Sequence, residues 1–117
     1  MTWQPYTPAR FQQALHDGRP VVVDIYADWC LPCQELDHVT FRNPQVAERL
    51  AQFVTLRVDA TREVPPQAEA LLDQYEIYGV PTVLIFDPNG RERSDLRVSG
   101  FVNASEFLER LTKVKTP

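Results

Sequence analysis

The sequence predicts an α/β fold in which helices flank a central mixed sheet, mostly parallel with an antiparallel hairpin at one edge. Short apolar runs rich in β-branched residues alternate with amphipathic segments of helical period, as in a parallel sheet covered by helices. The sequence DPNG at residues 87–90 is typical of a turn and predicts a hairpin between the last two strands. The length of 117 residues suits one domain with a buried core, so we expect residues 1–117 to form a single domain.

The N-terminal half is predicted from its helix boundaries and apolar runs. Thr7 and Pro8 supply an N-cap and a proline in the first helical position, and Gly18 ends that helix. Residues 21–27 are almost entirely apolar, which predicts a central strand buried on both faces. A helix is expected to begin at the cysteine pair that follows. Another helix begins at Asn43, before a second strand over residues 53–58.

The C-terminal half continues the alternation of helix and strand. A helix is expected over about residues 66–75, and a strong strand over residues 83–86. A short strand at residues 96–98 should pair with that strand as a hairpin. Asn103 caps the last helix, with Glu106 three residues later as in a capping box. The inner face of this helix is formed by Phe107, Leu108, Leu111 and Val114.

Charge and composition exclude several classes of protein. The net charge is −4, the isoelectric point is about 5.1 and no basic stripe is present, so we expect no nucleic-acid partner. Apolar runs such as residues 83–86 are far shorter than the roughly 18 residues that a membrane span needs. Polar side chains within residues 1–20 would interrupt the apolar core of a signal peptide.

Cys30 and Cys33 are the only cysteines, and their spacing predicts thiol–disulfide chemistry. Such exchange requires an exposed thiolate and a second thiol close enough to resolve the mixed disulfide. At a helix N-terminus, free N–H groups and the helix dipole favour the thiolate of the first cysteine. We therefore expect Cys30 to attack and the less exposed Cys33 to resolve, with their redox-active disulfide serving in place of any cofactor.

Two other interpretations of the cysteine pair are weaker. A purely structural disulfide that closes a four-residue loop contributes only about 2 kcal/mol in the chain-entropy model. Structural zinc usually takes four protein ligands. The two histidines, His16 and His38, lie on different predicted helices, so we expect no metal site.

The residues around the cysteines resemble the thioredoxin superfamily. The resemblance rests on DIYADWCLPC at residues 24–33 and GVPT at residues 79–82. Further stretches, TFRNPQV at residues 40–46 and VSGF at residues 98–101, resemble the C-terminal domain of DsbD-type transmembrane thiol:disulfide interchange proteins. The match extends from about residue 11 to residue 111 and implies a thioredoxin fold.

The resemblance also implies a protein-disulfide reductase and a route for its electrons. In that family a membrane-embedded donor domain reduces this domain, which reduces a periplasmic acceptor domain that serves disulfide isomerases and cytochrome c biogenesis. It implies a monomeric domain of an inner-membrane protein on the periplasmic side, whose partners are protein thiols and disulfides. Leu31 and Pro32 lie between the cysteines, and Pro32 is more like ordinary thioredoxin, which leaves open a free-standing, cytoplasmic general reductase. A non-catalytic interaction or zinc-binding module is the third alternative.

Several further residues are candidates for the site. Asp24 lies within an apolar strand, where a carboxylate is costly unless partnered or protonated, and we expect it to exchange a proton with Cys33. Asp37 stands where the family typically has Glu, four residues after the second cysteine. Within the thioredoxin fold Pro81 would be cis and oppose the cysteines. The residues expected to dock a substrate are Trp29, Leu31, Pro32, Val80 and Pro81.

The charges near the motif predict the direction of exchange. Acidic neighbours disfavour the thiolate of the reduced form and so make the reduced form less stable relative to the disulfide. The domain is therefore expected to act as a reductant rather than an oxidant. No Lys or Arg is near the motif in sequence. The acidic residues are Asp24, Asp28, Glu35 and Asp37.

Overall fold

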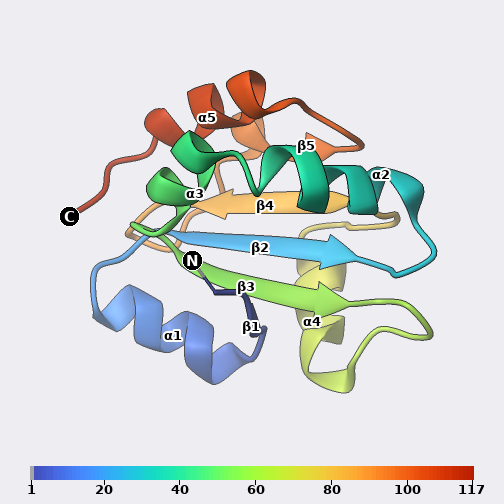
Figure 1. Cartoon of the computed structure of the whole chain (residues 1–117). Coiled ribbons are helices and arrows are strands. Elements are labelled where there is room, and N and C mark those ends of the chain that lie inside the picture. The colour runs from blue at the N-terminus through green and yellow to red at the C-terminus, as the bar shows by residue number, and fades with distance from the viewer. Residues whose placement is uncertain (1) are drawn as a thin grey trace.

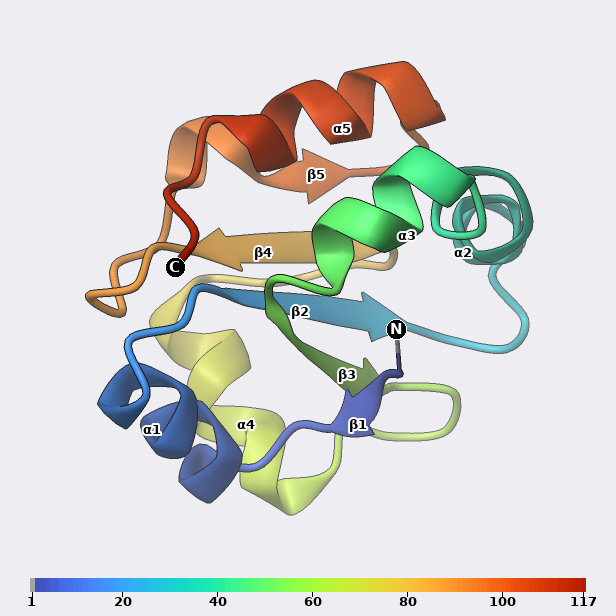
Figure 2. The same cartoon turned by 60° about the vertical axis from the view of Figure 1, so that its left-hand side comes forward.

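Five strands form one mixed sheet, in the order β1-β3-β2-β4-β5. The computed structural model describes residues 2–117 (Figures 1 and 2). β3 pairs in parallel with both β1 and β2, whereas β4 runs antiparallel to both β2 and β5. The strands are β1 (Gln4–Pro5), β2 (Val21–Tyr26), β3 (Val54–Asp59), β4 (Thr82–Phe86) and β5 (Val98–Ser99).

Helices cover both faces of this sheet. One face carries α1 (Pro8–His16) and α4 (Pro66–Gln74), and the other carries α2, α3 and α5, as Figure 2 shows. The second group comprises α2 (Leu31–Glu35), the π-helical segment η1 (Leu36–Thr40), α3 (Pro44–Leu50) and α5 (Ala104–Thr112). A short 3₁₀ turn, η2 (Ser94–Leu96), precedes β5. The predicted α/β architecture with a mixed sheet and flanking helices is confirmed.

The antiparallel part of the sheet begins one strand earlier than the sequence predicts. β3 ends at Asp59, opposite Tyr26, and β4 begins at Thr82, opposite Ile25, so both points lie at the same end of the sheet. The segment between β3 and β4, which includes α4, therefore starts and finishes at the same end of the sheet. In Figure 1, α4 lies across the strand direction. β4 must then run back alongside β2.

Strand β1 was not expected from the sequence. It has two exposed residues and contains Pro5, so it shows no alternating apolar pattern. Only its pairing with β3 defines it, with Gln4 opposite Leu56 and Pro5 opposite Arg57. The predicted helix starts agree with the structure, because the side chains of Thr7, Asn43 and Asn103 each accept a backbone N–H of the first turn.

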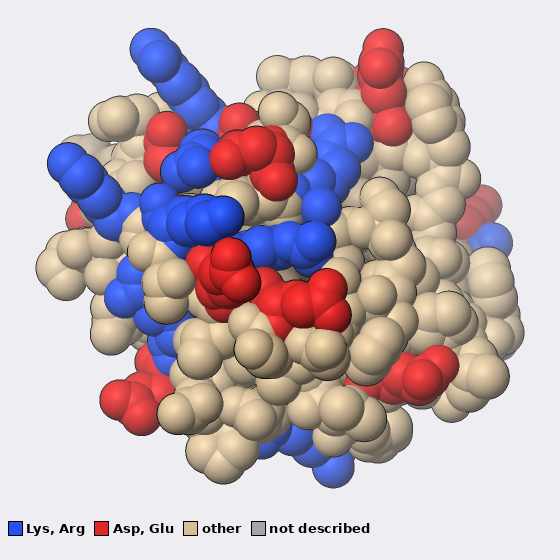
Figure 3. Space-filling model, turned by 90° about the horizontal axis from the view of Figure 1, so that it is seen from above, with Lys and Arg blue, Asp and Glu red and all other residues tan. Residues whose placement is uncertain are grey.

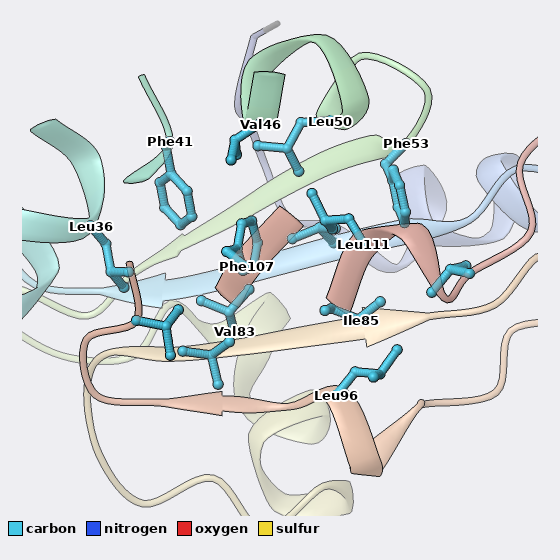
Figure 4. Close-up of a cluster of buried hydrophobic side chains, with 14 residues drawn as sticks. Leu36, Phe41, Val46, Leu50, Phe53, Val83, Ile85, Leu96, Phe107 and Leu111 are labelled. Carbon is cyan, nitrogen blue, oxygen red and sulfur yellow. The ribbon is translucent and has the colours of Figure 1, made fainter. Parts of the chain in front are cut away.

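Alternating residues of the strands separate the core into two clusters. In β2, Val22 points toward α3 and α5, whereas Val21, Val23 and Ile25 point toward α1 and α4. Figure 4 shows the cluster on the side of α3 and α5, in which Phe107 of α5 lies among the other side chains that cover the sheet. Asp24 has the same strand phase as Val22, so its carboxyl group faces the helices that include α2 and η1.

Charged side chains are mixed on the face that carries α5. Figure 3 shows Lys and Arg gathered toward one side of this face, with acidic side chains among them. Three of the ion pairs in this part of the chain are Arg93–Asp95, Arg97–Glu92 and Lys113–Glu109. Within residues 2–117, none of the helices combines the length and apolar character required to cross a membrane.

Candidate active site

The cysteine pair lies at the start of α2, at the end of the sheet where β2 and β3 end (Figure 1). Cys30 is the N-cap residue of α2 and is joined to Cys33 by a disulfide, with their Cα atoms 5.2 Å apart. The backbone N–H of Cys33 donates to Sγ of Cys30 at 3.2 Å. Pro32 occupies the first turn, where a missing N–H costs no helical hydrogen bond.

Exposure separates the two cysteines by very little. In the disulfide form the residues are 5% and 4% exposed. Their hydrogen bonds do distinguish them, because the Cys30 sulfur accepts a backbone N–H at the helix start. A negative charge on that sulfur would be stabilised by the same N–H and by the helix dipole.

The indole of Trp29 is exposed but held in place. It is 68% exposed and so lies outside the core. Its Nε1 donates to the carbonyl oxygen of Thr61 at 2.8 Å, and the N–H of Asp28 donates to the Thr61 hydroxyl at 2.9 Å. The loop after β3 therefore fixes the segment that leads into the cysteines.

The segment before β4 faces the disulfide. The Val80–Pro81 peptide bond is cis, as expected for the fold. Val80 packs against the small buried cluster formed by Ala27, Cys30 and Cys33. The carbonyl of Pro81 accepts the N–H of Gly100 at 3.2 Å, which ties this segment to the chain after β5.

Apolar side chains are exposed around this segment. Trp29, Leu31 and Tyr78 are the large ones, and Tyr78 is 89% exposed. Trp29, Tyr78 and Val80 line a mainly apolar groove of about 260 Å³, and Val80 also packs against the cysteines. Pro32 is exposed and Pro81 buried. A groove with this lining can accept an apolar side chain.

Asp24 and Asp37 are joined by one arginine beneath the cysteine helix. Arg57 lies directly opposite Asp24 in the pairing of β2 and β3. Its Nη2 is 2.9 Å from Oδ2 of Asp24 and 2.6 Å from Oδ1 of Asp37. No Lys or Arg is near the motif in sequence, but the fold places Arg57 beside two of the acidic residues.

Burial governs the protonation of Asp24. The residue is 2% exposed, and the loss of hydration raises its pKa from 3.8 to about 6. Arg57 opposes this rise, while the charge of Asp37 adds to it. A carboxyl group with this pKa can accept or donate a proton near neutral pH.

Metal ligands do not gather at this site or elsewhere in residues 2–117, where no group of three or more His, Cys, Asp and Glu side chains could hold a metal ion. His16 lies on α1 and His38 on η1, both exposed. The disulfide is the redox group that the site contains.

Comparison with known proteins agrees with this geometry. A family profile described as Thioredoxin-like matches residues 2–88, which include both cysteines and the segment with the cis proline. The chain belongs to the thioredoxin-like family. A solved relative, the reduced C-terminal domain of DsbD from Neisseria meningitidis, shares 31% identity and a TM-score of 0.78, with 92% of each chain covered.

Two further proteins are similar to the chain. It is 42% identical over 111 residues to the thiol:disulfide interchange protein DsbD of Tatumella citrea, covering 93% of this chain but 19% of that protein. The chain thus spans about a fifth of the length of this curated relative. A solved thioredoxin from Thermus thermophilus has a TM-score of 0.79 and 28% identity, with 97% of this chain and 85% of that chain covered.

Arg57, Thr61 and Tyr78 are the site residues that sequence reasoning missed in this thioredoxin-like domain. Arg57 had a detectable signal, since it is a charged residue between Leu56 and Val58 within an apolar strand. An arginine and an aspartate in the middle of two neighbouring strands suggest a buried ion pair. Thr61 had no such signal, because only the fold brings its loop to Trp29.

Proposed function

We propose that this chain is a protein-disulfide reductase domain that works by dithiol–disulfide exchange. The observation that carries the proposal is the Cys30–Cys33 disulfide at the start of α2, packed against Val80 of the cis-proline segment. An exchange site of this kind needs a thiolate stabilised by a helix N-terminus and a neighbouring resolving thiol. Both requirements are met by these residues.

The proposed reaction transfers two electrons from the dithiol to a substrate disulfide. The Cys30 thiolate attacks one sulfur of the substrate, so that a mixed disulfide forms and the other substrate sulfur leaves as a thiolate. The Cys33 thiol then loses its proton and attacks the Cys30 sulfur. The Cys30–Cys33 disulfide forms, the second substrate thiolate leaves, and protons taken up by the two thiolates complete the reduction.

Asp24 is proposed as the group that takes the proton from Cys33. Its pKa of about 6 makes the carboxylate the main form at neutral pH, while leaving it basic enough to accept a proton. Asp37 follows Cys33 by four residues, so the two share one side of the helical segment. Its proposed role is to act on Asp24 through Arg57.

The substrate is proposed to dock on the surface around the disulfide. Trp29, Leu31 and Pro32 would contact its side chains, and the Val80–Pro81 segment would contact its backbone. Exposed apolar area at the centre of a polar surface is typical of a protein-binding site. The substrate class is therefore protein thiols and disulfides, with no nucleic acid.

The DsbD relatives support a place in an electron relay. We propose that the chain is a monomeric domain on the periplasmic side of an inner-membrane protein, reduced by a membrane-embedded donor and oxidised by a periplasmic acceptor. The likeness over nearly the whole chain to proteins named for thiol:disulfide interchange supports this assignment. A free-standing, cytoplasmic general reductase is the second candidate, favoured by the thioredoxin-like Pro32 and by the structural likeness to a thioredoxin.

Trapping of mixed disulfides tests the assignment of the cysteines. With Cys33→Ser, attack by Cys30 still occurs but resolution does not, so mixed disulfides with a substrate protein should accumulate and disappear on reduction. Cys30→Ser is the matched control and should trap nothing through this site. Trapping by Cys30→Ser alone would reverse the two roles, and trapping by neither variant would refute the reductase proposal.

The relay and the free-standing reductase are separated by their redox partners, an acceptor in the first test and a donor in the second. The reduced Cys33→Ser domain should exchange readily with the oxidised periplasmic domain of a DsbD protein if the relay is correct. The disulfide form of the unmodified chain should be a poor substrate for the cytoplasmic NADPH-dependent thioredoxin-reducing system. Efficient reduction by that system, without exchange with the DsbD domain, would favour the free-standing enzyme.

A further inference from the structure

Arg57 connects the two acidic side chains of the site, Asp24 and Asp37. It extends from the middle of β3 toward the helices on the face that carries α2 and η1. Its Nε donates to Oδ2 of Asp24 at 3.0 Å, and its Nη2 donates to Oδ1 of Asp37 at 2.6 Å. One guanidinium thus binds two carboxylates from two different elements.

Two aromatic rings hold the same guanidinium. The Cζ atom of Arg57 lies 4.5 Å from the ring centre of Tyr26, at the end of β2, and 4.7 Å from the ring centre of Trp3. Trp3 reaches Arg57 because β1, directly after it, pairs with β3. Cation–π contacts of this kind and the two ion pairs restrict the side chain to one place.

The restricted arginine has a consequence for the two acids. Asp24 is buried on β2 and Asp37 is half-buried on η1, so without a cation between them their charges would repel each other. With the cation, both carboxylates are held on the side of the sheet covered by the helix that begins at the cysteines. A proton acceptor is effective only when it is held within reach of its donor.

We propose that Arg57 is a positioning residue for thiol–disulfide exchange, which holds the Asp24 carboxylate toward the cysteine helix by bridging it to Asp37. The proposal rests on the proposed role of Asp24 as the proton acceptor of Cys33. The side chain itself neither contacts the substrate nor exchanges a proton. It acts on the step in which Cys33 resolves the mixed disulfide, and leaves the attack by Cys30 largely unaffected.

Two charged side chains act on Asp24, and their effects on its pKa are opposite. They are Arg57 on β3 and Asp37 on η1. The two cysteines lie at the start of the helical segment over the same face. Arg57 lowers the pKa of Asp24, and Asp37 raises it. Removing Arg57 should therefore move the pH midpoint of resolution upward, and removing the charge of Asp37 should move it downward. A merely structural role would not produce opposite shifts.

A two-step reaction separates attack from resolution. The reduced domain is mixed with excess 5,5′-dithiobis(2-nitrobenzoate) in stopped flow. Attack by Cys30 releases the first nitrothiobenzoate, and resolution by Cys33 releases the second. The two phases are followed from about pH 5.5 to about pH 8.5, since the resolving step should gain rate as Asp24 ionises.

In Arg57→Gln, the midpoint of the second phase should rise by about one pH unit, which at pH 6 slows that phase about five-fold. In Asp37→Asn the midpoint should fall. Arg57→Lys keeps the charge but lacks the planar fork, so its midpoint should lie between those of Arg57→Gln and the unmodified protein. Asp24→Asn should remove this pH dependence, and Arg57→Gln should then cause no further change.

Arg93→Gln is the matched control. Arg93 also binds a carboxylate with two nitrogens, that of Asp95, but it follows the far end of β4 from the cysteines. Both phases should be unchanged in this variant. If Arg57→Gln does not fold, the downward shift in Asp37→Asn and its absence in the double variant with Asp24→Asn still test the bridge.

Each possible failure has a distinct meaning. An unchanged midpoint in both Arg57→Gln and Asp37→Asn, with two normal phases in the unmodified protein, would overturn the positioning role and leave the reductase intact. Equal slowing at every pH would also overturn it, since that result indicates a structural role. Absence of a second phase in the unmodified protein would instead refute the proposed exchange itself.

Discussion

The buried carboxyl group of Asp24 should make the stability of this domain depend on pH in a defined direction. Burial raises its pKa from 3.8 to about 6, so the folded protein holds a proton that the unfolded chain releases between these values. The folded state therefore loses stability as the pH rises from about 4 to above 6. The shift corresponds to about 3 kcal/mol of unfolding free energy, with the whole loss present at pH 7.

Asp24→Asn should remove this loss, because the amide does not ionise. The amide oxygen can still accept a hydrogen bond from Arg57, which also keeps its ion pair with Asp37. Any cost of the substitution itself is the same at every pH. Part of the loss has already occurred at pH 4, so the stability of the variant minus that of the unmodified protein should increase by about 2 kcal/mol between pH 4 and pH 7.

Urea unfolding of the disulfide forms at several pH values between 4 and 7 measures this difference. Asp59→Asn is the control, because the Thr61 hydroxyl lowers the pKa of that exposed carboxyl group. The stabilisation that the lowered pKa of Asp59 contributes is complete above its ordinary pKa of 3.8 and is lost only at lower pH. The stability difference between Asp59→Asn and the unmodified protein should therefore be level across this range. A level difference for Asp24→Asn as well would show that burial does not control this carboxyl group.

Two further outcomes are expected. The reduction potential should lie nearer to the value of about −270 mV of thioredoxin than to about −120 mV of a strong oxidant, because Arg57 neutralises only one of the two adjoining carboxylates. Equilibration with a glutathione or dithiothreitol couple measures it, and a value close to −120 mV would contradict the reductase direction. Tyr78→Ala should raise KM for insulin reduction about five-fold with little change in kcat or stability, because the ring is 89% exposed beside the docking groove. Val39→Ala, at an exposed position on η1, is the control, and an equal KM in both variants would remove Tyr78 from the docking surface.

The sequence predicted the helices and main strands because their signals are local. The cap residues Thr7, Asn43 and Asn103 mark helix starts through hydrogen bonds that reach only a few residues along the chain. Strand β2 was recognisable because Asp24 alone interrupts the apolar run of residues 21–25, and a strand buried on both faces lacks a polar alternation. β1 was not recognisable, because a two-residue strand is defined only by its partner.

Part of the candidate site was predictable for the same reason. The spacing of Cys30 and Cys33 places both within one helical turn, so the pair implies its own geometry. Asp24 was recognisable as a buried carboxyl group from its apolar neighbours in the strand. The cis bond before Pro81 came from the family resemblance, since nothing local to the residue requires it.

The order of the helices and main strands, the reactive cysteine pair and the burial of Asp24 follow from the sequence alone, because each depends on neighbours within one helical turn or one strand. The tertiary structure alone decided the direction of β4, the contact of Thr61 with Trp29 and the pairing of Asp24 with Arg57. Asp24 and Arg57 are 33 residues apart, and the register of β2 on β3 sets them opposite each other. That register follows from how the two apolar faces of the sheet pack against helices, so no local pattern specifies it.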